Sequence, residues 1–141
     1  MISKKNIAIL GSTGSIGKST LEVVRTNPKY FNIICITANK NVIDLAQQIN
    51  EFKPKYAYID NKDSANDLEI KIIDSKTKII KNKKDLCDVL ASDEIDSIVS
   101  AMSGSSGLFL TNHALNNNKQ VLLANKESMV MAGPIFKKFK Q

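Results

Sequence analysis

The stretch NIAILGSTGSIGKST, Asn6–Thr20, decides the fold class of this chain. It begins with a short apolar run, Asn6–Leu10, which is typical of a strand buried on both faces of a parallel sheet. The run ends at a turn that contains three glycines, and a helical pattern begins at about Ile16. A strand, a glycine turn and a helix in this order predict the opening unit of a nucleotide-binding α/β domain.

Strands and helices alternate along the rest of the chain. Apolar or β-branched runs indicate strands, and apolar residues at helical spacing indicate the helices between them. Further strands are expected at Asn32–Ala38, Tyr56–Ile59, Lys78–Ile80, Ser97–Ala101 and Gln120–Ala124, with helices at about 16–25, 41–52, 64–73, 82–91 and 107–116 and a last helix opened by Pro134. This alternation predicts one Rossmann-like domain over residues 1–141, built on a doubly wound parallel sheet.

The glycine turn has the spacing GxxGxxG and is expected to bind phosphate. Gly11 permits the tight turn, Gly14 lets the backbone approach a pyrophosphate, and Gly17 lets the helix pack closely on the strand. Free N–H groups at the helix start then bind the anion. Hydroxyl donors are expected from Ser12, Thr13 and Ser15. The alternative is a glycine-rich turn without a ligand.

The end of the second expected strand bears on the choice of cofactor. NAD-binding enzymes usually place Asp or Glu there, where the carboxylate binds the ribose 2′-hydroxyl. This chain has Asn39-Lys40-Asn41 at that point, and the next acid is Asp44. Lys40 offers positive charge where a 2′-phosphate would lie, unless it is only a solvated loop lysine. The pattern therefore favours NADP.

Composition excludes several other classes of protein. The chain is 43% hydrophobic and 24% charged, as expected for a globular domain. The net charge of +6 comes from scattered lysines without a basic stripe or interleaved aromatics, so we expect no nucleic-acid partner. Ser97–Asn118 lacks acids and bases but contains Ser, Asn and Gly, so we expect no membrane helix. Cys35 and Cys87 form no CxxC pair and no leader is expected, which indicates the cytoplasm, or a plastid-like stroma in a eukaryote.

Four segments together resemble the 1-deoxy-D-xylulose 5-phosphate reductoisomerase family. They are GSTGSIGKSTLEVVR at Gly11–Arg25, ANKNV at Ala38–Val42, SAMSGSSGL at Ser100–Leu108 and LLANKESMV at Leu122–Val130. The resemblance implies an oxidoreductase of non-mevalonate isoprenoid (terpenoid) biosynthesis. Such an enzyme uses NADPH and a divalent metal, Mg or Mn, to rearrange and reduce its sugar phosphate substrate to 2-C-methyl-D-erythritol 4-phosphate.

The resemblance also assigns roles to residues. The cofactor phosphates would be held by the Gly11 turn, the 2′-phosphate flanked by the second strand's end, and the nicotinamide and substrate contacted after the last strand. The residues are Thr13, Gly14, Ser15 and Ile16 for the phosphates, Lys40 and Asn41 for the 2′-phosphate, Asn125 and Glu127 for the nicotinamide side, and Lys126 for the substrate. Asn39 departs from the family, which commonly has Gly there.

The family's metal ligands have no counterpart in this sequence. His113 is the only histidine, and we expect it on a helix surface and not as a ligand. In the family the carboxylate ligands follow the segment that ends here at Gln141, and further domains come after them. We therefore expect an NADPH-binding domain that binds cofactor without turnover and has no catalytic residue of its own, from an enzyme that is a homodimer at full length.

Three other functions share some of these sequence features. An aspartate-semialdehyde-type dehydrogenase needs a nucleophilic Cys, whereas Cys35 and Cys87 fall in core positions. A short-chain reductase needs Tyr-x-x-x-Lys on a helix, whereas Tyr58 and Lys62 fall at a strand end and a turn. A stand-alone NADP-sensing module would share the same fold, so the fold alone does not exclude it.

Overall fold

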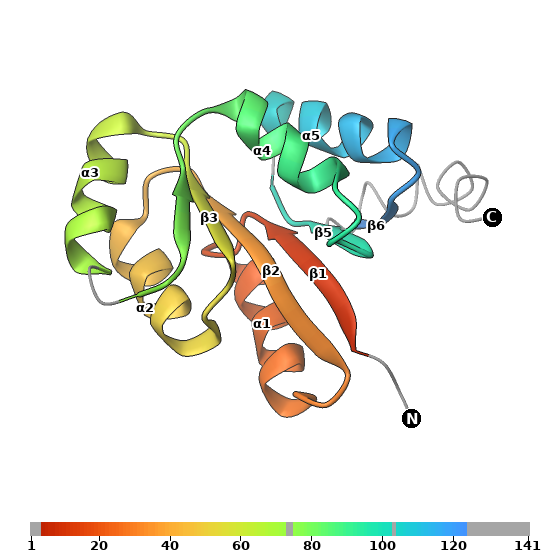
Figure 1. Cartoon of the computed structure of the whole chain (residues 1–141), viewed down its shortest axis with the longest axis horizontal. Helices are drawn as coiled ribbons and strands as arrows, with labels where there is room; N and C mark the ends of the chain where they lie inside the picture. The colour runs from red at the N-terminus through yellow and green to blue at the C-terminus, as the bar shows by residue number, and fades with distance from the viewer. Residues whose placement is uncertain (1–3, 73–74, 103, 124–141) are drawn as a thin grey trace.

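The computed structural model describes residues 4–72, 75–102 and 104–123. In this part of the chain, strands and helices alternate and the strands form one parallel sheet, as predicted (Figure 1). The elements are β1 (Lys5–Leu10), α1 (Ser15–Thr26), β2 (Phe31–Ala38), α2 (Val42–Phe52), β3 (Tyr56–Ile59), α3 (Lys62–Lys71), β4 (Lys78–Ile80), α4 (Lys83–Ala91), β5 (Ser97–Ser100), α5 (Gly104–Asn116) and β6 (Gln120–Leu123).

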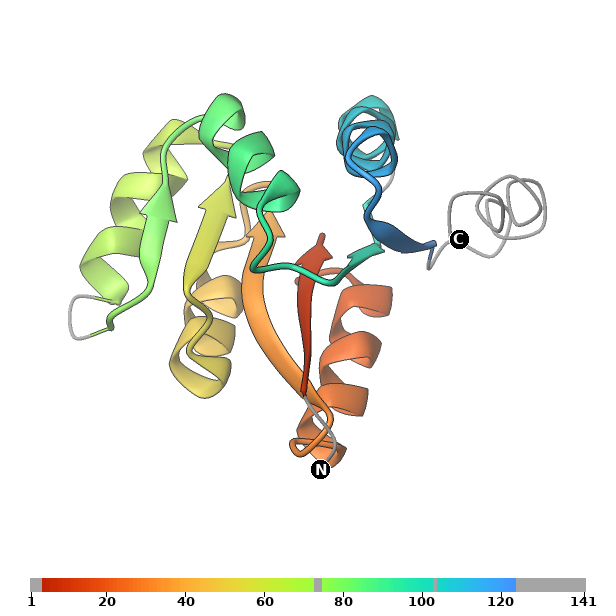
Figure 2. The ribbon, with the colours of Figure 1, turned by 45° about the vertical axis from the view of Figure 1, so that its right-hand side comes forward.

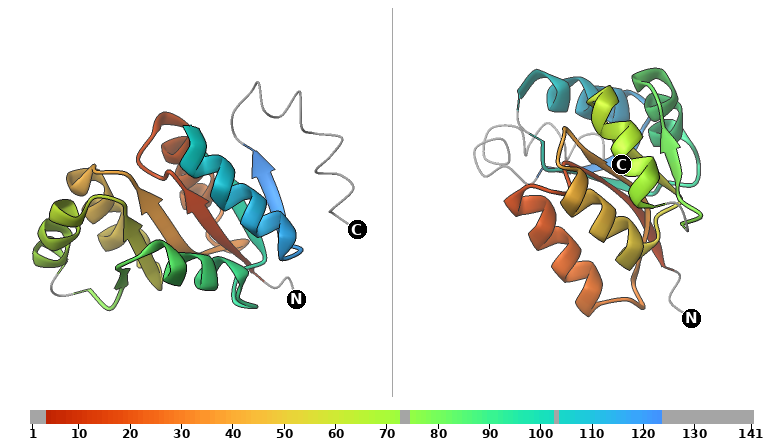
Figure 3. Two further views of the ribbon diagram at one scale, coloured as in Figure 1. Left: turned by 90° about the horizontal axis from the view of Figure 1, so that it is seen from above. Right: turned by 90° about the vertical axis from the view of Figure 1, so that its left-hand side faces the viewer.

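The sheet is doubly wound, with strand order β4-β3-β2-β1-β5-β6. Helices α1, α2 and α3 pack on one face, and α4 and α5 pack on the other, as the views from different sides show (Figures 2 and 3). The chain runs outward from β1 through β2 to β4, then returns to the other side of β1 as β5. The loops after β1 and β5 therefore diverge at the carboxyl edge, where sheets of this kind bind ligands.

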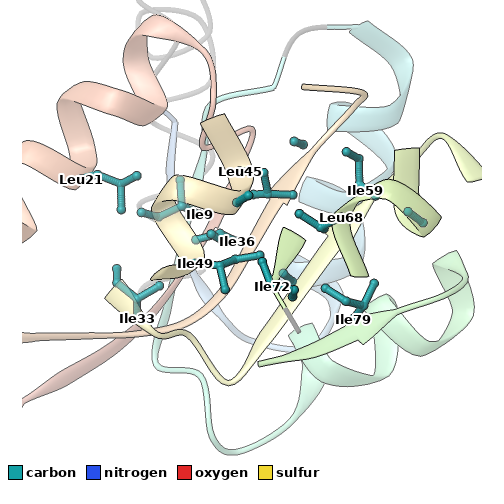
Figure 4. Packing of buried hydrophobic residues seen from close by; sticks show 14 of the residues in the cluster. Ile9, Leu21, Ile33, Ile36, Leu45, Ile49, Ile59, Leu68, Ile72 and Ile79 are labelled. Carbon is teal, nitrogen blue, oxygen red and sulfur yellow. The ribbon is translucent and has the colours of Figure 1, made fainter. Parts of the chain in front are cut away.

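Two apolar clusters hold these layers together. On the first face, Ile9 and Ile36 of the sheet meet Leu45 and Ile49 of α2, and all four are fully buried (Figure 4). Each such side chain contributes about 1.5–3 kcal/mol on burial. The second cluster joins the opposite face to α4 and α5, with Ile98 of β5 at 0% exposure. Because both faces are covered, the strands are mainly apolar, and most of their polar residues stand at the strand ends.

A bulge interrupts β2. Ile7 pairs with Ile33 but Ala8 pairs with Cys35, so Ile34 is an extra residue opposite β1. Ile34 and Cys35 consequently both join the cluster under α4 and α5, where strict alternation would place them on opposite faces. The bulge was not expected from the sequence, because β-branched residues occur on both sides of it.

The predicted boundaries need small corrections. The third helix spans Lys62–Lys71 and not 64–73. It begins early because the Asn61 side chain caps it, accepting a hydrogen bond from the Ser64 N–H at 3.0 Å. The strand expected over Ser97–Ala101 ends at Ser100. The helix expected from Pro134 lies outside the described residues. None of the helices described is long and apolar enough to cross a bilayer.

Candidate functional site

A cavity of about 260 Å³ opens at the carboxyl edge of the sheet. It lies where the loops after β1 and β5 diverge, which is the ligand-binding position of doubly wound sheets. Its lining comes from the ends of four neighbouring strands and from α4 and α5: Gly11, Thr13, Gly14, Thr37, Ala38, Asn39, Tyr58, Asp60, Lys83, Ala101, Met102 and Leu110. The structure thus brings the predicted phosphate loop together with the end of β2.

Gly11 and Gly17 have the structural roles that their spacing predicts. Gly11 has a φ of +82°, a conformation that other residues rarely adopt, and its N–H donates to Thr37 Oγ1 at 3.0 Å. A Cβ on Gly17 would lie 2.2 Å from the carbonyl oxygen of Gly11 and 2.6 Å from Ser12 Cα. Gly17 therefore allows α1 to start directly against the turn.

Gly14 leaves the start of α1 open. It is the N-cap residue, no side chain caps the helix there, and the first turn contains no acid. By contrast, α2, α3 and α4 each begin with an asparagine whose side chain caps the helix. A Cβ on Gly14 would meet nothing closer than 3.8 Å, so the fold does not itself require glycine there. The backbone N–H groups and positive dipole end of α1 are therefore available to an anion.

The three loop hydroxyls do not all face outward as expected. Ser12 is fully buried, and its hydroxyl donates to Gln48 Oε1 at 2.6 Å, so the expectation of a ligand donor at Ser12 is wrong. Thr13 lines the cavity, and Ser15 and Ile16 are exposed at the start of α1. Gln48 was missed, although a polar residue on the helix face shared by Leu45 and Ile49 is a signal of a buried contact.

At the end of β2, Lys40 is exposed, whereas the nearby carboxylate of Asp44 is paired with another side chain. Lys40 is exposed in the turn that enters α2, and the Asn41 side chain caps that helix by accepting from the Asp44 N–H at 3.1 Å. Asp44 forms an ion pair with Lys18 of α1 at 2.8 Å. This hydrogen-bonded pair lowers the pKa of the Asp44 carboxyl and keeps its oxygens engaged. Lys40 is the first charged residue after β2 in the sequence, whereas Asp60 and Lys83 are the charged residues that line the cavity itself.

Tyr58 and Lys62 do not form a reductase pair. Tyr58 is buried on β3, and its hydroxyl donates to Asp60 Oδ1 at 2.8 Å. Burial, followed by the Asp60 carboxylate, raises the pKa of the Tyr58 hydroxyl above its usual range. A tyrosine that serves as an acid in reduction needs the opposite shift. Lys62 is exposed at the first position of α3.

The cysteines and the histidine have structural surroundings. Burial raises the pKa of the Cys35 thiol to about 12, and burial also raises the pKa of the half-buried Cys87, so neither resembles an activated nucleophile. His113 is half-buried rather than on the surface, because its Nε2 lies 2.9 Å from the Cys87 carbonyl oxygen and joins α5 to α4. Within residues 4–72, 75–102 and 104–123, no three His, Cys, Asp or Glu side chains gather as metal ligands.

Asn125, Lys126 and Glu127 lie outside the described residues. Their expected contacts with the nicotinamide and the substrate therefore stay predictions. The part of the site that the structure describes is the phosphate loop, the end of β2 and the cavity between them.

Comparison with known proteins agrees with this geometry. The family model for 1-deoxy-D-xylulose 5-phosphate reductoisomerase matches residues 7–133. A reductoisomerase from Zymomonas mobilis, solved in complex with NADPH, is 34% identical with a TM-score of 0.82, over 97% of this chain and 36% of that one. Another, solved with NADPH, fosmidomycin and magnesium, is 36% identical with a TM-score of 0.81, over 96% of this chain and 33% of that one.

A third reductoisomerase structure, in complex with magnesium, is 35% identical with a TM-score of 0.82. It is matched over 97% of this chain and 34% of its own length, so this chain spans about a third of the solved relatives. The family model covers most of the chain and includes the phosphate loop, the end of β2 and the segment after β6. The chain belongs to the 1-deoxy-D-xylulose 5-phosphate reductoisomerase family.

Proposed function

We propose that this chain is the NADPH-binding part of a 1-deoxy-D-xylulose 5-phosphate reductoisomerase. The observation that carries the proposal is the open N-terminus of α1 at Gly14, beside the cavity at the sheet's carboxyl edge. Two related structures at 34% and 36% identity were solved with NADPH. Family membership favours this function over a stand-alone sensing module or another NADP-dependent dehydrogenase.

The residues present fit the cofactor. The start of α1 is open at Gly14, since the nearest atom to a Cβ built there, outside the adjacent residues, is the Gly11 carbonyl oxygen at 3.8 Å, and Gly14 itself lines the cavity. Backbone N–H groups of Thr13, Ser15 and Ile16 would bind the pyrophosphate, and Lys40 and the turn at Asn41 would hold the 2′-phosphate. NADPH supplies a hydride when bound. The residues of this chain bind the cofactor and orient it.

The same proposal covers the reaction of the whole protein. With NADPH and a divalent metal, the whole enzyme would rearrange and reduce 1-deoxy-D-xylulose 5-phosphate to 2-C-methyl-D-erythritol 4-phosphate, a step of isoprenoid biosynthesis. Lys126 would contact the substrate, while Asn125 and Glu127 would contact the nicotinamide side. We further propose a homodimer in the cytoplasm or, in a eukaryote, a plastid-like stroma. Since the chain spans about a third of its solved relatives, we propose that residues 1–141 bind cofactor without turnover.

Titration of the chain with NADPH and with NADH, followed by nicotinamide fluorescence, tests the binding proposal. NADPH should bind at least about tenfold more tightly, because a charged hydrogen bond to the 2′-phosphate contributes about 1.5–3 kcal/mol. Gly14→Ala should weaken the binding of both cofactors, since the added methyl group would lie at the proposed phosphate site without disturbing the fold. Absence of NADPH binding, or equally tight binding of NADH, would contradict the proposal.

A further inference from the structure

One buried polar side chain contacts the phosphate loop from a different element. Gln48 of α2 is 7% exposed and shares a helix face with Leu45 and Ile49, which are both fully buried. A buried amide costs free energy unless its hydrogen bonds are made. The amide oxygen and the amide nitrogen of Gln48 each form a hydrogen bond with the same residue, Ser12. Gln48 Oε1 accepts from Ser12 Oγ at 2.6 Å, and Gln48 Nε2 donates to the Ser12 carbonyl oxygen at 2.9 Å.

This pair of contacts determines how the peptide between Ser12 and Thr13 is oriented. A carbonyl oxygen only accepts hydrogen bonds, so the amide nitrogen of Gln48 must face it. In a planar trans peptide the C=O and the N–H point in opposite directions. With the Ser12 carbonyl held toward α2, the Thr13 N–H points away from α2. Thr13 lines the cavity, and no hydrogen bond among the described residues uses its N–H.

The preceding peptide is held separately. The Ser12 N–H donates to the Thr37 carbonyl oxygen at 2.9 Å, and this bond does not involve Gln48. Removing the Gln48 amide would therefore leave the Gly11–Ser12 peptide in place and release only the next one. If the released peptide rotated, its carbonyl oxygen would face the site, where its negative dipole end would repel an anion.

We infer that Gln48 is a positioning residue for the cofactor phosphates: by holding the Ser12 carbonyl, it presents the Thr13 N–H to them. This inference rests on the proposed function, because the anion is a phosphate of NADPH. Helix α2 therefore has two roles, since its first turn follows Lys40 and its second turn, through Gln48, orients the phosphate loop.

Two variants separate the two hydrogen bonds. Gln48→Met keeps a similar side-chain size and removes both bonds, whereas Ser12→Ala removes the hydroxyl bond and keeps the carbonyl bond. The measurements are the residual dipolar coupling of the Thr13 N–H without ligand and the Kd for NADPH. Gln48→Met should change the coupling and raise the Kd about tenfold. Ser12→Ala should leave the coupling and the Kd near the wild-type values, even if it lowers the free energy of unfolding as much as Gln48→Met does.

An unchanged coupling in Gln48→Met with a Kd within about threefold of wild type would overturn the inference, as would an equal loss of affinity in Ser12→Ala. If Gln48→Met does not fold, Gln48→Leu takes its place, since it also lacks the amide and its neighbours Leu45 and Ile49 on the same helix face are apolar. The same two measurements, with the same outcomes, then decide the inference. If the wild-type chain binds no NADPH, the proposed function fails. The dipolar coupling still tests whether Gln48 fixes the orientation of the Ser12–Thr13 peptide.

Discussion

Gly14 and Gly17 lack side chains for different reasons. At Gly17 an added methyl group would meet backbone atoms of Gly11 and Ser12 at 2.2 and 2.6 Å, and backbone cannot yield as a flexible side chain can. Gly17→Ala should therefore lower the free energy of unfolding by at least about 2 kcal/mol, as measured by urea denaturation. Gly14→Ala should stay within about 0.5 kcal/mol of wild type. Equal effects of the two substitutions would contradict this assignment.

Lys40 is the residue on which the preference for the 2′-phosphate depends. Lys40→Ala should weaken NADPH binding about tenfold and leave NADH binding unchanged, because NADH carries no phosphate at that position. Lys29→Ala is the matched control, since Lys29 is also exposed but lies in the turn before β2, at the opposite edge of the sheet. A loss of NADH affinity equal to that of NADPH would show that Lys40 contacts another part of the cofactor.

Residue roles could be predicted where spacing alone determines them. The positions of Gly11 and Gly17 follow from the need for a left-handed turn and a close helix start, and the structure has both. Ser12 could not be assigned, because the direction of its hydroxyl depends on Gln48, which is 36 residues away and on another helix. Hydrogen bonds between distant elements leave no fixed spacing in a sequence.

The asparagine caps of α2 and α3 offer a comparison between elements. Asn41 accepts from the Asp44 N–H at 3.1 Å, and Asn61 accepts from the Ser64 N–H at 3.0 Å. Substitution of either by Ala should cost about 1 kcal/mol in urea denaturation. NADPH affinity should fall more in Asn41→Ala, because α2 begins directly after Lys40. Asn61 contacts this segment through its backbone N–H, which donates to the Asn39 carbonyl oxygen at 3.1 Å and is kept in Asn61→Ala. Similar losses of affinity in both variants would indicate a general effect of destabilisation.

The buried thiol of β2 gives the fold a dependence on alkaline pH. The pKa of Cys35 is raised by burial to about 12, whereas an unfolded cysteine ionises at about 8.5. The contribution of the protonated Cys35 thiol to the free energy of unfolding is therefore complete below about pH 8.5. It decreases as the pH rises, because the unfolded chain then loses a proton that the folded chain keeps. The difference in unfolding free energy between wild type and Cys35→Ala should decline by about 2 kcal/mol between about pH 8.5 and about pH 10.5. Parallel curves for the two proteins would refute this.

Element order could be predicted almost completely, since buried parallel strands and amphipathic helices have distinct patterns. The departures have local causes. The Asn61 cap starts α3 two residues before its expected beginning, and the bulge at Ile34 shifts the register of β2 against β1. Both depend on which backbone groups meet in space, and a run of apolar letters such as NIICITA does not encode that.

At the scale of the whole molecule, cofactor binding should stabilise the domain as a unit. The proposed contacts come from the start of α1 and the end of β2, and both are joined to the core through α2. A ligand at a hundred times its Kd adds about 2.7 kcal/mol to the free energy of unfolding, which corresponds to a rise in Tm of roughly 5–11 °C for a domain of this size. Differential scanning calorimetry with NADPH should show this rise in one cooperative transition. NADH at the same concentration should produce a smaller rise, and Gly14→Ala should reduce the NADPH shift while keeping the ligand-free Tm. A rise that is the same for both cofactors, or that persists in full in Gly14→Ala, would place binding away from the α1 terminus.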